Sequence, residues 1–342
     1  MSAFPCRRGV NFGMWLSQAD VRDEAQLAKR FSEADFKRLA ASGADHVRLP
    51  IDHELIEETE SPHDLREVGL AWVDQALAWA WKHGLCVILD LHKTAGMSFF
   101  TPEQNRLWDD AALQQRFARL WGGLARRFQA APHDRLVFEL LNEPTATDNE
   151  AWNRVAALAL AAIREVDHER WVVVGSNSWN VPPTFADLRD FRDPRVAYAV
   201  HWYEPFLFTH QKAPWCEWLK QLDLTVHYPL QMPDLTAVAA PLPRPEWREQ
   251  CMLFSQQALG YERMERWFAP VADFARRSGA PIICTEFGCW DPAPLASQLA
   301  WFADCLRLFA AHGVAWSQWE HSCLWQRDGT PRPPLAVLFP KR

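Results

Sequence analysis

The stretch Leu136-Val-Phe-Glu-Leu-Leu-Asn142-Glu143-Pro144 decides the fold class of this chain. It is an apolar run that ends in an amide, a carboxylate and a proline. The run predicts a buried strand, and Pro144 ends that strand because proline has no N–H to donate to a neighbouring strand. Glu143 is therefore expected at the carboxyl end of a strand, where parallel barrels keep their chemistry.

A second stretch, Pro281-Ile-Ile-Cys-Thr-Glu286-Phe-Gly288, has the same form. Its apolar run delivers one carboxylate, Glu286, just before a glycine turn. Two carboxylates at strand ends fit glycoside hydrolysis, which needs a proton donor for the leaving oxygen and a carboxylate that attacks, or activates water, at the anomeric carbon. Glu143 and Glu286 are therefore the candidate catalytic residues.

Short apolar runs alternate with longer amphipathic runs along the whole chain. The predicted strands lie near residues 8–12, 45–49, 85–91, 135–141, 171–175, 196–202, 281–286 and 314–318. Helices are predicted at about residues 24–42, 67–83, 103–129, 149–166, 256–278 and 295–311, with an irregular piece at 182–190. This alternation predicts an α/β protein with a parallel sheet and crossover helices, and eight such units predict a closed (β/α)8 TIM barrel.

The regular alternation favours a single catalytic domain over residues 1–342, although a chain of this length could also form two ordinary domains. Residues 203–250, after the sixth strand, are the exception to the pattern. They carry many prolines and aromatic residues and have no clear helical period. Connections of this length are usually functional loops or disordered linkers, and the tryptophans and tyrosine in this one favour an ordered loop over the face that carries the strand ends.

Composition narrows the functional classes. No run of eighteen apolar residues occurs, so no membrane span is predicted. The net charge of −7 comes without a basic block, which argues against a nucleic-acid partner and for a neutral or weakly charged substrate. Because the sequence contains no C-x-x-C or H-E-x-x-H motif, neither a metal nor another cofactor is expected. We also expect a monomer.

The eight cysteines are scattered, and several lie in predicted strands or helices. This distribution favours reduced, buried thiols over disulfides, as in a cytosolic protein. The first residues, Met-Ser-Ala-Phe-Pro-Cys-Arg-Arg, show no signal peptide. The cytoplasm is therefore the favoured location, and secretion is the alternative if a leader is absent from the sequence.

Polar and aromatic side chains recur at the carboxyl ends of the predicted strands. They are Arg48, His92, Asn142, Glu143, His201, Tyr203, Glu286 and Trp319. All are expected at one rim of the barrel, the face where barrel enzymes place catalytic groups. Asn11 is expected either to bond a rim residue or simply to end the first strand. Glu139 lies within its strand, so we expect a buried structural carboxylate paired with an arginine or a histidine.

With these motifs the chain resembles the glycoside hydrolases of family 5, the cellulase family of a large clan of retaining barrel enzymes. The resemblance extends from Arg8-Gly-Val-Asn11-Phe to Trp319. It implies that Glu143, in the Asn-Glu-Pro motif, is the acid/base and that Glu286 is the nucleophile. It also implies substrate-binding or supporting roles for Arg48, His92, Asn142, His201, Tyr203 and Trp319.

These roles make chemical sense residue by residue. Glu143 must hold a proton near neutral pH, which requires a pKa raised by burial and nearby negative charge. Glu286 must stay ionised to attack, and Arg48 together with the Tyr203 hydroxyl would favour that state. Asn142 can bond the sugar 2-hydroxyl, a contact that strengthens in the transition state. The two histidines would orient the carboxylates and the sugar.

Tryptophan is unusually frequent, at 19 residues, and several tryptophans lie at or beyond strand ends. A pyranose offers apolar C–H faces, and a flat aromatic ring buries a large area against them. Trp319 is expected to form the floor under the reacting sugar ring. Trp179, Trp290 and Trp325 are possible further sugar platforms, and for each of them simple packing is an equally good explanation.

The resemblance implies β-linked glucans or mannans cut with retention, but the motifs do not encode the linkage. We favour an endo-β-1,4-glucanase, because barrels of this size with open rims commonly resemble cellulases. The loop at residues 203–250 could instead wall off one end of the cleft, as an exo-acting β-glucanase or a β-glucosidase requires. A β-mannanase is a weaker contender.

Two other classes fit less well. A catalytically silent carbohydrate-binding barrel would usually have lost the acid or the nucleophile, whereas both carboxylates are present here. A metal-dependent barrel hydrolase would show clustered histidines and aspartates at the strand ends, whereas the histidines here stand singly.

Overall fold

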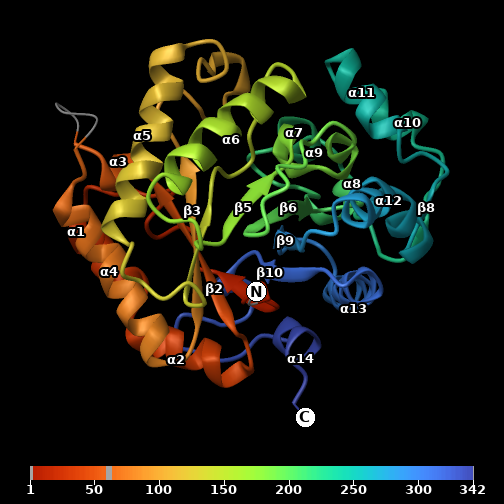
Figure 1. Ribbon diagram of the computed structural model, residues 1–342. Coiled ribbons are helices and arrows are strands. Elements are labelled where there is room, and N and C mark those ends of the chain that lie inside the picture. Colours follow the sequence, from red (N-terminus) through yellow and green to blue (C-terminus); the bar gives the residue numbers. More distant parts are fainter. Residues whose placement is uncertain (1–2, 59–63, 342) are drawn as a thin grey trace. The chain divides into compact units, whose positions relative to one another are not determined.

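The computed structural model describes residues 3–58 and 64–341. Parallel strands close into a barrel in the order β1-β10-β9-β6-β5-β4-β3-β2, which confirms the predicted TIM barrel (Figure 1). These strands are β1 (Arg8–Asn11), β2 (His46–Asp52), β3 (Cys86–Lys93), β4 (Leu136–Glu139), β5 (Val172–Gly175), β6 (Val196–Trp202), β9 (Ile282–Phe287) and β10 (Ala315–Gln318). Each predicted strand corresponds to one of them.

The largest shift of a strand end is at β2, which we expected to end at Leu49. The strand instead continues through Pro50 to Asp52. Proline removes only one donor from the ladder, and pairing resumes beyond it because the Asp52 N–H donates to the Leu16 carbonyl (3.0 Å). Pro50 is in register with Asp90 of β3.

Contacts within the chain define two compact units. The first takes its described residues from Met1–His201, Pro270–Glu286 and Val314–His321, and the second comprises Trp202–Ala269, Phe287–Gly313 and Ser322–Arg342, apart from the last residue. Helices α1 (Glu24–Arg30), α2 (Glu33–Ser42), α3 (His53–Ile56), α4 (Glu67–Lys82), α5 (Ala111–Arg127), α6 (Asn149–Arg164) and α7 (Asn177–Asn180) belong to the first unit. Helix α5 packs beside α6, and α2 beside α4, outside the strands (Figure 1).

Two predicted helices of the first unit are each divided, and a polar residue caps the second part of each. The expected helix at residues 24–42 is divided into α1 and α2 at Ser32, which forms a capping box with Asp35. The expected helix at 103–129 becomes a short 3-10 helix (Pro102–Gln104) followed by α5. Asp110 starts α5 by accepting from the N–H groups of its second and third residues.

Glycines end three helices just before a strand. Gly84, Gly279 and Gly313 follow α4, α12 (Tyr261–Ser278) and α13 (Leu295–His312) with φ angles of 78°, 67° and 66°. This left-handed backbone is easy for glycine and strained for residues with a Cβ.

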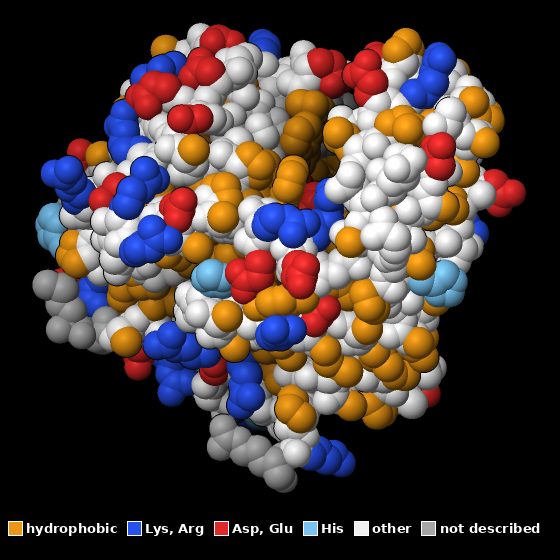
Figure 2. Space-filling model, turned by 90° about the vertical axis from the view of Figure 1, so that its right-hand side faces the viewer, with side chains coloured by type: hydrophobic (Ala, Val, Ile, Leu, Met, Phe, Trp, Pro, Cys, Tyr) orange, Lys and Arg blue, Asp and Glu red, His pale blue; other side chains and the backbone are white. Residues whose placement is uncertain are grey.

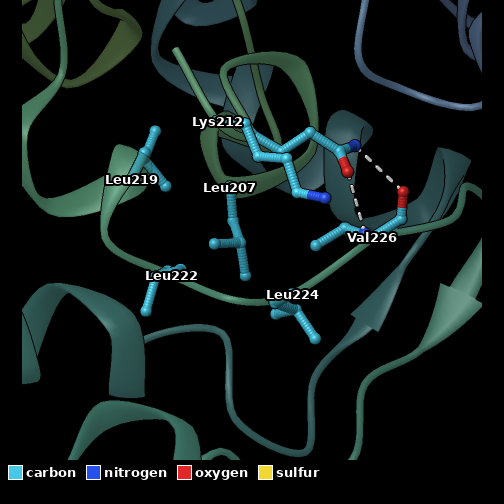
Figure 3. A pocket seen from close by; sticks show the side chains of 7 residues that line it. Leu207, Lys212, Leu219, Leu222, Leu224 and Val226 are labelled. Atoms are coloured by element: carbon cyan, nitrogen blue, oxygen red, sulfur yellow. Dashed lines mark hydrogen bonds between the residues drawn. The ribbon is translucent and has the colours of Figure 1, made fainter. Parts of the chain in front are cut away.

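The second unit holds most of the long connection after β6. Its helices, besides part of α12, are α8 (Phe206–Thr209), α9 (Glu217–Lys220), α10 (Thr236–Ala239), α11 (Pro245–Met252), α13 and α14 (Pro334–Leu338), and β7 (Leu230–Gln231) pairs with β8 (Ala258–Leu259). The connection contains the short helices α8 to α11, where the sequence showed no clear helical period. Gln211 exchanges two hydrogen bonds of 3.0 Å with the backbone of Val226, and Leu207, Leu219 and Leu222 pack around them (Figure 3).

An apolar layer fills the barrel, with Ile88, Val137, Val173 and Ala197 among its members. The cysteines are thiols and not disulfides, in agreement with the prediction, and six of the eight are buried. Across the part of the chain that the structure describes, no helix is both long enough and apolar enough to cross a bilayer.

Candidate active site

Arg48 is the hub of a polar cluster at the carboxyl ends of the strands. It lies in the middle of β2, a strand in which every residue is buried, and its side chain has no exposed surface. Its Nε donates to Glu139 Oε2 (2.6 Å), and its Nη1 donates to Glu286 Oε1 (2.7 Å). Its Nη2 donates to Asn142 Oδ1 (2.9 Å). The rigid guanidinium fork on β2 therefore fixes β4, the residue Asn142 that follows it, and β9 relative to one another.

Two further predictions for this cluster are confirmed. Glu139 is a fully buried structural carboxylate that pairs with Arg48 through both of its oxygens (2.6 and 3.1 Å). Asn11 at the end of β1 accepts from Arg48 Nη1 (2.9 Å) and donates to the carbonyl of Thr285 (2.9 Å). It thereby connects the hub to β9, the strand that carries Glu286.

The two candidate catalytic carboxylates meet at His201. The Nδ1 of His201 is 2.9 Å from Glu143 Oε1 and 3.7 Å from Glu286 Oε2. One donor atom of each of these three residues lies within 4.8 Å of the other two. Glu143 follows β4 with φ at 43°, a left-handed conformation that a residue with a side chain adopts only when its surroundings hold it there.

The electrostatics differ between the two carboxylates. Burial raises the pKa of Glu143 to about 8, and the positive charge of Arg48 opposes this shift only in part. Glu143 is thus the protonated member of the pair at neutral pH. Glu286, in contrast, is in direct contact with the guanidinium of Arg48, at 2.7 Å. Burial lowers the pKa of His201 to about 4, so the imidazole between the two carboxylates is neutral.

Glu143, His201 and Glu286 also carry donor atoms of the kind that bind divalent cations. Arg48, however, already supplies a positive charge 2.7 Å from Glu286, and a second cation in the same place would be repelled. The donor set therefore fits an acid and nucleophile pair better than a metal centre.

An aromatic pair, Trp319 and His92, lies at the carboxyl ends of β10 and β3. Trp319 follows β10, and its ring stacks on His92 with centroids 5.6 Å apart and planes 3° apart. A Cβ built on Gly13 would come within 2.9 Å of the Trp319 ring, so this position has room only for glycine under the tryptophan. The arrangement fits the predicted floor for a sugar ring.

The tryptophans proposed as further platforms differ in exposure. Trp179 is 42% exposed, and it is held by hydrogen bonds from its ring N–H to the Phe99 carbonyl (3.2 Å) and from its backbone N–H to the Pro144 carbonyl (3.3 Å). It therefore lies next to the residue that follows Glu143. Trp290 is 37% exposed, and Trp325 is only 4% exposed. We do not retain Trp325 as a platform, because a buried ring has no open face for a sugar.

The first unit holds seven of the eight predicted motif residues. Arg48, His92, Asn142, Glu143, His201, Glu286 and Trp319 all belong to it, and the contacts above connect them. Tyr203 and Trp290 belong to the second unit, so the predicted hydrogen bond from the Tyr203 hydroxyl to Glu286 stays a prediction.

Asp90 is the residue of this cluster that sequence reasoning missed. It is fully buried on β3 and lies between His92 Nδ1 (2.7 Å) and Arg48 Nη2 (3.0 Å). A signal for it was present, since it is the one charged residue in the predicted strand at 85–91. A lone charge in a buried strand requires a partner, and Arg48 in the neighbouring strand is the obvious one.

Comparison with known proteins agrees with this geometry. The model of the family described as "Cellulase (glycosyl hydrolase family 5)" matches residues 17–323. The chain is 32% identical to the Endoglucanase C of Acetivibrio thermocellus over 92% of this chain and 91% of that protein. It is 33% identical to the Cellodextrinase A of Ruminococcus flavefaciens over 90% of this chain and 83% of that protein.

Among solved structures, the endoglucanase Cel5A of Thermotoga maritima is similar in fold. It superposes with a TM-score of 0.78 at 23% identity, covering 97% of this chain and 96% of that chain. The family match over most of the chain, together with both carboxylates on one barrel, identifies the chain as a glycoside hydrolase. This chain belongs to glycosyl hydrolase family 5.

Proposed function

We propose that this protein is a retaining endo-β-1,4-glucanase in which Glu143 is the acid/base and Glu286 the nucleophile. The observation that carries the proposal is the spacing of these residues: one carboxylate oxygen of Glu143 lies within 4.8 Å of one carboxylate oxygen of Glu286. Retaining enzymes hold their carboxyl groups about 5–5.5 Å apart, whereas inverting enzymes need about 6.5–9.5 Å to admit a water molecule. The relatives named endoglucanase support a glucan as the substrate.

The supporting residues fit a double displacement. The carbonyl oxygen of Asn142 is committed to Arg48, so its amide N–H group is the part that can donate to the sugar 2-hydroxyl. Arg48 holds Glu286 in place for attack on the anomeric carbon. The proton on Glu143 goes to the glycosidic oxygen as the bond breaks, and the same carboxylate then takes a proton from the water that releases the sugar.

One observation favours a second candidate, exo-type action on soluble oligosaccharides. The similarity to Cellodextrinase A covers almost as much of the chain as the similarity to Endoglucanase C, and the identity is 33%. A glucanase that releases short products from chain ends would use the same carboxylates and differ only in the loops around the cleft. β-Mannan is a third substrate to test.

The expected partner is a β-linked oligo- or polysaccharide, and the protein is expected to act as a monomer in the cytoplasm. The net charge of −7 supports a neutral substrate over nucleic acid. On the face shown in Figure 2, acidic and basic side chains are intermixed, without the broad basic stripe that a phosphate backbone attracts.

Product analysis separates these functions. The purified protein is incubated with carboxymethyl cellulose, mixed-linkage glucan, β-1,3-glucan, mannan and aryl glucosides, while viscosity and reducing ends are followed together. We expect a rapid loss of viscosity on carboxymethyl cellulose and mixed-linkage glucan, with few reducing ends formed. Reducing ends without a loss of viscosity would indicate exo action, and hydrolysis confined to mannan would overturn the glucanase proposal.

A further inference from the structure

Asp90 takes part in the site through His92 and has no role in the mechanism described above. It lies on β3 in register with Pro50 of β2 and Glu139 of β4. Its Oδ2 is the atom that contacts both His92 Nδ1 (2.7 Å) and Arg48 Nη2 (3.0 Å). Its Oδ1 has no hydrogen-bond partner among the described residues. All of its interactions therefore pass through a single oxygen.

The chemistry of Arg48 decides which way the hydrogen bond to His92 runs. A guanidinium can only donate, so Oδ2 of Asp90 is an acceptor toward Arg48. A carboxylate oxygen that already accepts one hydrogen bond readily accepts a second, and the Nδ1 of a neutral imidazole supplies it when the proton is on that nitrogen. The lone pair of His92 is then on Nε2, on the far side of the ring.

The Nε2 of His92 is a buried nitrogen that can still accept a hydrogen bond. It has no hydrogen-bond partner among the described residues, although His92 is 1% exposed. The ring is also fixed in orientation, by stacking on Trp319 and by an edge contact with Phe99 (centroids 5.2 Å apart). A buried polar atom without a partner, next to a flat aromatic floor, indicates that a ligand completes its hydrogen bond.

We propose that Asp90 is a positioning residue that holds His92 with its proton on Nδ1, so that Nε2 accepts a hydrogen bond from a hydroxyl of the sugar bound on Trp319. The identity of the ligand rests on the proposed function, whereas the position of the proton does not. An acceptor at this point selects for a ligand hydroxyl that can donate.

The charges around Asp90 set the pH range in which this arrangement holds. Arg48 and Asp52 face it from β2, His92 from β3, and Glu139 and Glu143 from β4 and the residues after it. Burial raises the pKa of Asp90 to about 7, and Arg48 opposes the shift. Burial lowers the pKa of His92 to about 3, so the ring stays neutral. Above about pH 8, Asp90 is therefore ionised while His92 carries one proton.

Nitrogen NMR of histidine-labelled protein without ligand tests the proton position directly, at about pH 8.5, where Asp90 is ionised. The His92 signals are assigned by their absence in His92→Gln. We expect wild-type His92 to show a protonated Nδ1 and an unprotonated Nε2. Adding cellobiose should shift the Nε2 signal more than the Nδ1 signal. A wild-type ring protonated on Nε2 would overturn the proposal without any variant having to fold.

Three variants separate positioning from general support of the cluster. Asp90→Ala removes the acceptor and should give mixed tautomers with a roughly 10- to 100-fold lower kcat/KM, the loss typical of removing a partner that orients a functional histidine. Asp90→Asn keeps an acceptor oxygen and should restore the Nδ1-protonated form. Glu139→Ala, the matched control, also removes a buried acid from Arg48 and should leave the His92 tautomer unchanged.

The possible outcomes are distinct. If Asp90→Ala keeps the wild-type tautomer, or if Glu139→Ala disturbs it equally, Asp90 is not what positions His92. If the tautomer follows the expectation but the protein hydrolyses no β-glucan, the proposed function fails while the role of Asp90 in setting the tautomer stands.

Discussion

Replacing Glu286 by alanine should lower turnover on every β-glucoside by about 10⁴-fold or more, because a catalytic group that acts as part of a unit supports nearly the whole rate. Without this carboxylate no glycosyl-enzyme can form, however good the leaving group. The cavity left beside Arg48 and His201 should admit a small anion. Added azide should then attack from the face once occupied by Glu286 and give a glycosyl azide of inverted configuration.

Glu57→Gln is a suitable control for this experiment. Glu57 is also buried and ion-paired, but its partners are Arg116 and His53, not the residues of the site. We expect wild-type turnover for this variant, measured beside Glu286→Ala on the same aryl glucoside with circular dichroism to verify folding. If Glu286→Ala kept substantial turnover without azide, Glu286 could not be the nucleophile.

Replacing Glu143 by alanine should instead produce a loss that depends on the leaving group. Cellulose fragments need protonation of the leaving oxygen, and their turnover should fall by roughly 10²- to 10⁴-fold, the contribution typical of general acid catalysis. An aryl glucoside with an acidic phenol needs little protonation and should still form the intermediate, which then accumulates. Azide should rescue this variant with retained configuration, since it attacks from the face that Glu143 serves.

The pH profile gives Glu143→Ala a second, independent readout. Wild-type activity should fall as the pH rises through about 8. Burial raises the pKa of Glu143 to that value, so above it the carboxyl has lost the proton that it must donate. The variant should lack this alkaline limb on the activated aryl glucoside. If the azide products of the two variants had configurations opposite to those expected, the labels of acid/base and nucleophile would have to be exchanged.

Sequence reasoning succeeded where the chemistry is local to a strand end. The apolar run before Asn142 and Glu143 predicted a strand with its functional residue in the right place, and so did the run before Glu286. Both predictions succeeded because apolar runs and chain-breaking residues determine the backbone only a few positions away from themselves. Arg48 was found for the same reason. The overlooked capping residues, Ser32 and Asp110, explain why two predicted helices are each divided in the structure.

The remaining features depend on contacts between distant parts of the chain. The role of Asp90 follows from its distances to Arg48 and His92, and the burial of Trp325 follows from how its segment packs. Neither property is encoded in the neighbouring residues. The same holds for the left-handed backbone of Glu143, because glutamate is not a residue type that favours this conformation.

The buried titratable groups of the site also couple stability to proton uptake. His92 and His201 have pKa values of about 3 and 4 in the folded protein, against about 6.5 in an unfolded chain. Between these values the unfolded chain binds more protons, so these histidines make stability rise with pH up to about 6.5. Glu143 and Asp90, with pKa values of about 8 and 7, act in the opposite sense from about pH 4 upward.

Above about pH 6.5 the two histidines are neutral in both the folded and the unfolded chain, so their contribution to stability no longer changes. Only the protonation of Glu143 and Asp90 still changes, and stability should therefore decline until about pH 8. Thermal unfolding should therefore give a higher Tm at about pH 6.5 than at about pH 8, and Glu143→Gln should flatten that difference. If the Tm of Glu143→Gln fell as much as that of the wild type between these two pH values, Glu143 would not be the cause of the decline. The proton that Glu143 retains for the leaving sugar thus makes the folded chain less stable in mild alkali, and the acid that performs the reaction limits the pH range in which the barrel is most stable.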